Sequence, residues 1–126
     1  MSTWERKGHI KNIRYLYGEF SVEQLEEHKR RLHSSIHWLL IYKDPETAYQ
    51  WKDVDVDKYL GVLLLRLGGL NELFGYPESI VTLMSVLEAV RIENSKDNFD
   101  WRVYRKLVLD AQSLVECLPS ETIERR

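Results

Sequence analysis

The sequence has a single cysteine, which excludes a disulfide within the chain. Cys117 lies among Leu114, Val115 and Leu118, and a thiol in such apolar surroundings is expected to be buried and unreactive. Stability must therefore come from a hydrophobic core. A chain of 126 residues is long enough to build one in a single domain.

The chain also lacks an excess of charge of either sign. Its formal net charge of −2 gives no overall attraction to nucleic acid or to a membrane surface. No segment reaches the roughly 18 uninterrupted apolar residues of a membrane span, since Arg66, Asn71 and Glu72 interrupt the best candidate. The N-terminal residues are charged where a signal peptide requires an apolar stretch. We expect a cytoplasmic protein with no membrane partner.

Sequence motifs of enzyme chemistry are missing as well. There is no G-x-S-x-G elbow, no phosphate-binding GxxxxGK[ST] and no GxGxxG. Asp53, Asp55 and Asp57 alternate as in a calcium-binding loop, but Lys58 and Leu64 occupy the positions that require Gly and Glu. We interpret these aspartates as favourable charges at a helix N-terminus, and expect neither catalytic residues nor a cofactor.

Two histidines offer the best candidate for a metal site. His33 and His37 are four residues apart on a predicted helix, so they share a face, and Glu26 lies two turns earlier. The HExxH motif is absent, because residue 34 is Ser34. We interpret these histidines as surface residues and expect no bound metal. A metal-dependent enzyme built on them is kept as an alternative.

Helical periodicity is what the sequence has in abundance. Apolar residues recur at three- and four-residue spacing along most of the chain, which predicts an all-α protein. We predict a compact bundle of about five helices in one domain over residues 1–126, with 119–126 as a flexible tail. The first predicted helix ends near Gly18, and the second covers residues 22–43. The third covers about 54–74, and the fourth runs from Pro77 to near Ile92. The fifth runs from Asp97 or Asn98 to Leu118.

The predicted helices carry more apolar surface than a small bundle needs. Residues 60–70 read LGVLLLRLGGL, and residues 38–42 read WLLIY, which is apolar around the whole helix. A homodimer would bury the excess, and we expect one. Gly68 and Gly69 each cost about 1 kcal/mol relative to Ala inside a helix. They indicate close approach of another helix, a kink or break, or a ligand contact.

Aromatic residues are frequent, with four Trp and seven Tyr. Tyr49 and Trp51 lie in the polar loop 44–53, where they have no evident need to be buried. Trp and Tyr often anchor protein interfaces, so these two are candidate binding residues. The alternative is that they fold back over the bundle as a lid on its core.

Basic residues cluster in two predicted helices. Lys29, Arg30 and Arg31 form one group; Arg102, Arg105 and Lys106 form the other. The second group lies beside Trp101 and Tyr104, a mixture that suits phosphates and stacked bases. Ordinary solvated helix faces would have the same composition.

These patterns favour a non-enzymatic interaction protein: an adaptor, a regulator or an inhibitor-like accessory factor. We predict that it binds another macromolecule, in the first place a protein, and that it does so as a homodimer. The alternative is a small nucleic-acid-binding protein that uses its basic helix faces. The candidate binding residues are Tyr49, Trp51, Lys29, Arg30, Arg31, Arg102, Arg105 and Lys106.

Overall fold

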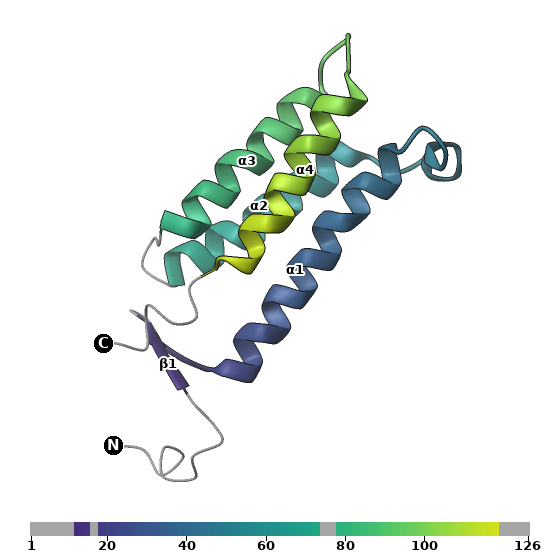
Figure 1. Cartoon of the computed structure of the whole chain (residues 1–126). Helices are drawn as coiled ribbons and strands as arrows, with labels where there is room; N and C mark the ends of the chain where they lie inside the picture. Colours follow the sequence, from purple (N-terminus) through teal and green to yellow (C-terminus); the bar gives the residue numbers. More distant parts are fainter. Residues whose placement is uncertain (1–11, 16–17, 74–77, 119–126) are drawn as a thin grey trace.

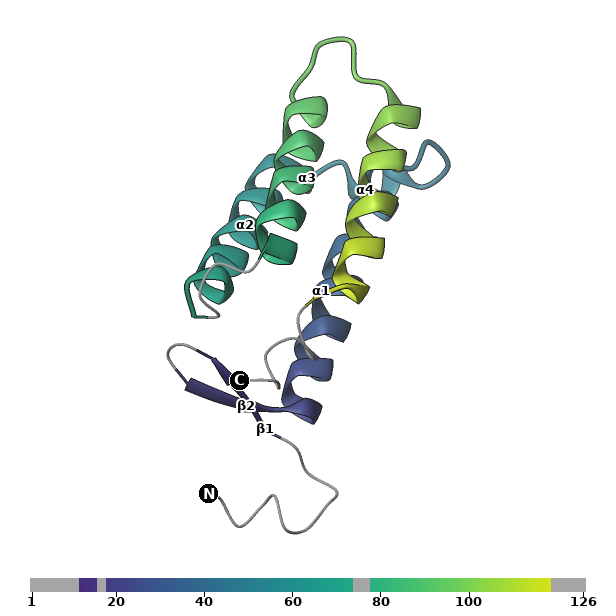
Figure 2. The same ribbon diagram turned by 60° about the vertical axis from the view of Figure 1, so that its left-hand side comes forward.

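Four α-helices lying side by side make up most of the computed structural model (Figures 1 and 2). The structure describes residues 12–15, 18–73 and 78–118. The helices are α1 (Val22–Lys43), α2 (Val56–Leu73), α3 (Glu78–Asn94) and α4 (Trp101–Glu116), and the short 3-10 helix η2 (Ala48–Trp51) lies between α1 and α2. The predicted helical class is confirmed, with four α-helices rather than about five. The tail expected at 119–126 lies outside the described residues.

The helix predicted to end near Gly18 is wrong. Strands β1 (Asn12–Tyr15) and β2 (Gly18–Ser21) pair antiparallel there, with Ile13 opposite Phe20. Ile, Tyr and Phe suit both a short helix stripe and a pleated strand, and periodicity alone does not separate the two over so few residues. Helix α1 follows directly at Val22, after Ser21 at the end of β2.

The helices share one apolar core. Helix α4 packs against α1 and α3, and α2 packs mainly against α3. Each helix contributes side chains from one apolar stripe, and burying each one contributes about 1.5–3 kcal/mol. The largest fully buried residues are Ile36, Leu39, Leu60, Leu67, Ile80, Leu83, Leu87, Val90, Tyr104 and Val108.

Two tyrosines fix α1 against its neighbours through hydrogen bonds to its backbone. The hydroxyl of Tyr104, which is fully buried in α4, donates to the carbonyl oxygen of Leu39 at 2.8 Å. The hydroxyl of Tyr59 in α2 donates to the carbonyl oxygen of Ser35 at 2.6 Å. Burial raises the pKa of both phenols, because the charged phenolate is poorly solvated in the core.

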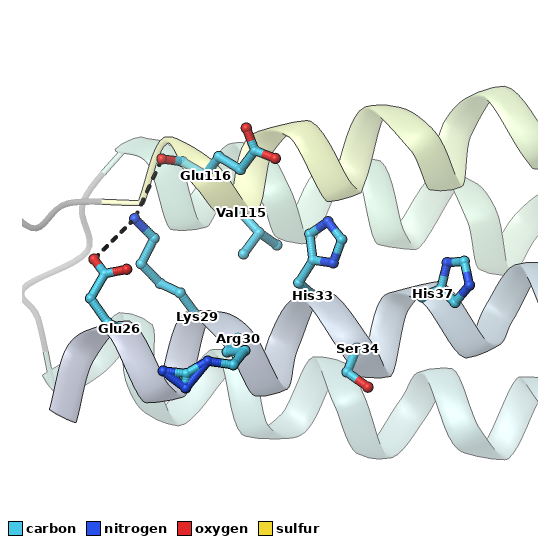
Figure 3. A pocket seen from close by; sticks show the side chains of 8 residues that line it. All are labelled: Glu26, Lys29, Arg30, His33, Ser34, His37, Val115 and Glu116. Atoms are coloured by element: carbon cyan, nitrogen blue, oxygen red, sulfur yellow. Dashed lines mark hydrogen bonds and ion pairs between the residues drawn. The ribbon is translucent and has the colours of Figure 1, made fainter. Parts of the chain in front are cut away.

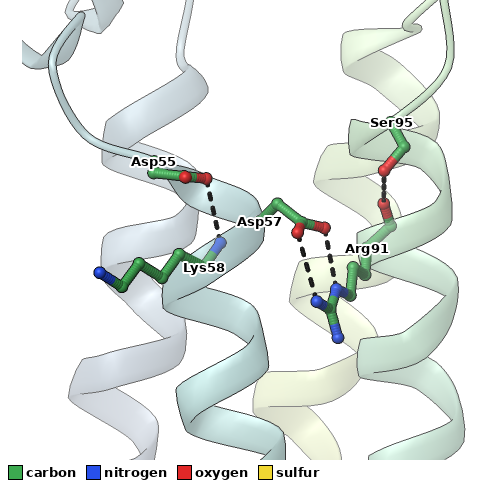
Figure 4. A network of polar contacts seen from close by, with 5 residues as sticks. All are labelled: Asp55, Asp57, Lys58, Arg91 and Ser95. Atoms are coloured by element: carbon green, nitrogen blue, oxygen red, sulfur yellow. Dashed lines mark hydrogen bonds and ion pairs between the residues drawn. The ribbon is translucent and has the colours of Figure 1, made fainter.

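The first turn of α2 is held by acidic side chains (Figure 4). The carboxylate of Asp55 accepts the backbone N–H of Lys58 at 3.0 Å, which confirms that an aspartate stabilises this N-terminus. Asp57 accepts two hydrogen bonds from Arg91 of α3, at 2.8 and 3.2 Å. The hydrogen bond from Arg91 lowers the pKa of Asp57.

Helix α2 continues without a break through its two adjacent glycines, which excludes a break among the three alternatives for this pair. A methyl group on Gly68 would lie 3.9 Å from the terminal methyl of Met84, an ordinary contact. A methyl group on Gly69 would meet nothing within 4 Å. Neither glycine is therefore required by the packing of α2 against α3.

The start of α4 depends on a buried carboxylate that precedes it. Glu93 is 4% exposed, accepts the backbone N–H of Asp100 at 2.9 Å, and pairs with Lys96 at 3.1 Å. Asp100 in turn caps α4 by accepting the backbone N–H of Arg102 at 2.9 Å. The predicted cap, Asp97 or Asn98, is therefore wrong by two or three positions.

Cys117 is exposed, so the prediction of a buried thiol is wrong. It is the C-cap of α4, and it lies outside the core-facing stripe that contains Val115. Its apolar sequence neighbours do not surround it in space.

Within the described ranges, no helix is long and apolar enough to cross a membrane.

Candidate interaction surfaces

The loop after α1 folds back onto the last turns of that helix. The hydroxyl of Thr47 donates to the carbonyl oxygen of Ile41 at 2.8 Å, and the backbone N–H groups of Thr47 and Ala48 bind the carbonyl oxygen of Asp44 at 2.9 and 2.8 Å. These bonds hold η2 against the C-terminal end of α1, where Figure 1 shows the loop. The position of Trp51 follows from this return of the chain.

Trp51 packs on two aromatic residues of α1. Its ring lies 5.4 Å from Trp38 and 5.7 Å from Tyr42, centroid to centroid, edge-on to both. Tyr42 makes a further edge contact with Tyr59 of α2 at 5.3 Å. Each such pair contributes about 0.5–1.5 kcal/mol beyond the area it buries. Trp51 therefore belongs to the packing of the bundle, as the alternative interpretation of this loop expected.

Tyr49 lies in the same short helix and has the opposite environment. It is 67% exposed, and its hydroxyl accepts a hydrogen bond from the neighbouring Gln50 at 3.1 Å. Trp38 is 37% exposed. We call Trp38, Tyr42, Tyr49 and Trp51 the aromatic surface. Trp38 was missing from the sequence prediction, and the signal for it was its spacing of four residues from Tyr42, which places both on one side of α1.

A groove of about 610 Å³ runs between α1 and the end of α4 (Figure 3). Lys29 lies at one end of it, 3.7 Å from the carboxylate of Glu26 and 3.4 Å from the carbonyl oxygen of Glu116. A lysine in this position satisfies an unpaired carbonyl at a helix C-terminus and complements its negative dipole. Lys29 is thus engaged within the molecule.

The other two basic residues of this group share one carboxylate. Arg30 and Arg31 both form ion pairs with Glu27, one turn earlier on α1. The hydrogen bond from Arg31 and the charge of Arg30 lower the pKa of Glu27. The positive patch expected at residues 29–31 is therefore largely balanced by its own helix.

The two histidines point into the same groove (Figure 3). The Nδ1 atom of His37 lies 3.4 Å from the side-chain amide nitrogen of Gln112 on α4. Glu26 is turned toward Lys29 at the far end. Among the described residues, no three His, Cys, Asp or Glu side chains come close enough together to hold a metal ion.

The basic residues of α4 lie at the opposite end of that helix. Arg102, Arg105 and Lys106 are exposed in its first turns, and Lys106 pairs with Asp110 at 3.2 Å. Arg102 and Arg105 make no ion pair with any residue in the described part of the chain. Because Lys29 meets α4 at Glu116, about 16 Å of helix separates the two basic groups. The fold does not bring them together.

No known protein family matches this chain, and neither a curated protein nor a solved structure matches it. Inference about its function therefore starts from these surfaces.

Proposed function

We propose that this chain is a non-enzymatic, cytoplasmic interaction protein that forms a homodimer and binds another protein through its aromatic surface. It would act as an adaptor, a regulator or an inhibitor-like accessory factor. The observation that carries the proposal is the exposure of Tyr49, at 67%, on a short helix that is anchored by the edge-on contacts of Trp51 with Trp38 and Tyr42.

The rigidity of this surface supports binding. Trp51 is held between Trp38 and Tyr42, so little side-chain entropy remains to be lost when a partner covers these rings. Trp and Tyr are the residues that most often carry the binding energy of protein interfaces. Tyr49 would insert into the partner, and Trp38 would form the floor beside it.

The charge of the loop indicates what kind of partner fits. Residues 44–53 contain Asp44, Glu46 and Asp53 against a single lysine, Lys52. An acidic rim around an aromatic anchor favours a partner with a basic surface around an apolar pocket. The mechanism is steric: by covering a surface of its partner, this chain would block that surface or recruit the partner.

Photo-crosslinking from position 49 tests this proposal. A benzophenone amino acid in place of Tyr49 should yield a covalent adduct with a single protein in a lysate of the source organism, and nuclease should not remove it. The matched control carries the same group in place of Leu109, on the outside of α4. Equal labelling from both positions, or none from position 49, would contradict the proposal.

A second function is favoured by Arg102 and Arg105 of α4, which form no ion pair with a residue that the structure describes. Arg102 and Arg105 are three residues apart on one exposed face, next to Trp101, and suit a nucleic-acid backbone. Binding of a labelled single strand or duplex should then weaken steeply as salt rises. Arg102→Glu with Arg105→Glu should abolish it, whereas the control pair Lys52→Glu with Arg66→Glu should not. No binding at low salt would eliminate this function.

A further inference from the structure

We propose that the outer face of α2 binds a second copy of this chain, with the two α2 helices antiparallel about a two-fold axis at Leu65. This inference supplies an interface for the homodimer of the proposed function and does not involve the aromatic surface.

The outer face of α2 is apolar where a solvated helix would be polar. Leu65 is 77% exposed and Val62 is 51% exposed. Gly69, one turn after Leu65, is exposed as well. Their spacing of three and four residues places them on one stripe, opposite the stripe that enters the core. A second apolar surface would remove this stripe from water.

The glycines indicate how closely that second surface approaches. Each glycine weakens α2 relative to alanine, and the packing of the monomer requires neither Gly68 nor Gly69. A backbone without Cβ atoms lets another helix come close. A methyl group on Gly69 would meet nothing within 4 Å, so a side chain of the second helix can approach the backbone there, and we call this gap the glycine notch.

Charge selects a second copy and sets its direction. Lys58 lies seven residues before Leu65, and Glu72 lies seven residues after it. Seven residues are close to two full helical turns, so both charges flank the apolar stripe on its own face. Neither side chain forms an ion pair with a residue that the structure describes, and Figure 4 shows Lys58 pointing away from the Asp57–Arg91 pair.

An antiparallel pair of α2 helices centred on Leu65 satisfies each of these features. Leu65 meets its own copy on the axis, and Val62 meets the glycine notch of the other chain. Lys58 of each chain meets Glu72 of the other, twice by symmetry. A parallel pair would instead place lysine against lysine and glutamate against glutamate, which is unfavourable.

Analytical ultracentrifugation across a wide concentration range tests the interface. The wild-type chain should sediment as a monomer–dimer equilibrium. Leu65→Glu should raise the dissociation constant about 100-fold, because two leucines leave the interface and two like charges meet on the axis. The matched control, Leu109→Glu, makes the same change on α4, which packs against α1 and α3 rather than α2. It should leave the constant unchanged.

Charge exchange tests the antiparallel direction. Lys58→Glu alone and Glu72→Lys alone should each weaken the dimer several-fold, and the two changes in one chain should restore it. Both positions are exposed, so these variants remain informative even if Leu65→Glu unfolds, which its thermal melt would reveal.

Three results would overturn the inference. The chain could be a monomer at every concentration, Leu65→Glu could leave the dissociation constant of the dimer unchanged, or the double charge exchange could fail to restore the dimer. None of them bears on the crosslink from position 49. Conversely, Tyr49→Ala should leave the dimer intact, so failure of the interface and failure of partner binding at the aromatic surface can be told apart. A monomer at every concentration would also remove the homodimer from the proposed function.

Discussion

At the scale of single residues, two aromatic side chains two positions apart differ in what they do. Tyr49 faces solvent, whereas Trp51 is packed edge-on against Trp38 and Tyr42. The sequence around both is polar, so nothing local separates them. Their difference arises because the loop returns onto α1, a contact set by Thr47 and the backbone of Ile41.

Substitution by alanine should reveal this difference. Trp51→Ala should lower the free energy of unfolding by about 2–3 kcal/mol, since it removes a half-buried ring and two aromatic pairs. Tyr49→Ala should change it by less than about 0.5 kcal/mol, as expected for an exposed side chain. Urea unfolding followed by circular dichroism measures both. Equal losses would mean that Tyr49 is also part of the packing and would remove the main support for the proposed function.

The basic residues show why charge clusters are hard to interpret from sequence. Lys29 is held by the C-terminal end of α4, through a contact between residues 87 positions apart. Only the pairing of α1 with α4 makes this contact, and periodicity does not specify which helices pair. The ion pairs of Arg30 and Arg31 with Glu27 are local, and their spacing of three and four residues is a signal that the sequence prediction did not use.

At the scale of elements, α2 combines an inner stripe that packs into the core with two adjacent glycines that weaken the helix. Its inner stripe, with Leu60, Leu63 and Leu67, is buried in the core. Its two adjacent glycines weaken the helix without serving the monomer's packing. The loss of helix stability at these glycines is explained if the outer face of α2 contacts a second copy of the chain, as proposed above.

Gly69→Ala should therefore act in opposite directions on folding and on assembly. The monomer should become more stable by up to about 1 kcal/mol, because alanine favours the helix and its methyl group meets open space. The dimer should become weaker, because the methyl group occupies the notch. Denaturation at a concentration where the chain is monomeric, together with sedimentation, measures the two effects. A dimer that tightens instead would contradict the proposed close approach.

The other elements differ in how far sequence could predict them. Helices α1, α2 and α3 have long apolar stripes, and their ends were predicted to within a few residues. The hairpin of β1 and β2 was missed because four-residue strands carry too little periodicity. The start of α4 was misplaced because Asp100 is positioned by Glu93, a buried carboxylate that a sequence pattern does not identify.

At the scale of the whole molecule, buried phenols make stability depend on pH at the alkaline end. Burial raises the pKa of Tyr104 and of Tyr59, so the folded state keeps protons that the unfolded chain releases. This contribution is fully present below the ordinary tyrosine pKa of about 10 and is lost as pH rises above it. The free energy of unfolding should fall above about pH 10.

Comparison with Tyr104→Phe isolates this effect. The variant should lose about 1 kcal/mol at neutral pH, because the carbonyl oxygen of Leu39 loses its hydrogen bond from the hydroxyl. Its free energy of unfolding should also fall less steeply above about pH 10, since one buried phenol is gone. Urea unfolding at a series of pH values measures both slopes. Parallel declines would mean that Tyr104 does not carry the alkaline sensitivity.

The placement of α4 between α1 and α3 also bears on how the protein is made. During translation α1, α2 and α3 leave the ribosome before α4, and the leucine and isoleucine faces that α4 covers remain open to water until then. The nascent chain therefore passes through a stage in which its longest helix lacks a principal neighbour. Chaperones that bind apolar segments would meet the chain at this stage, and the docking of α4 would end their access.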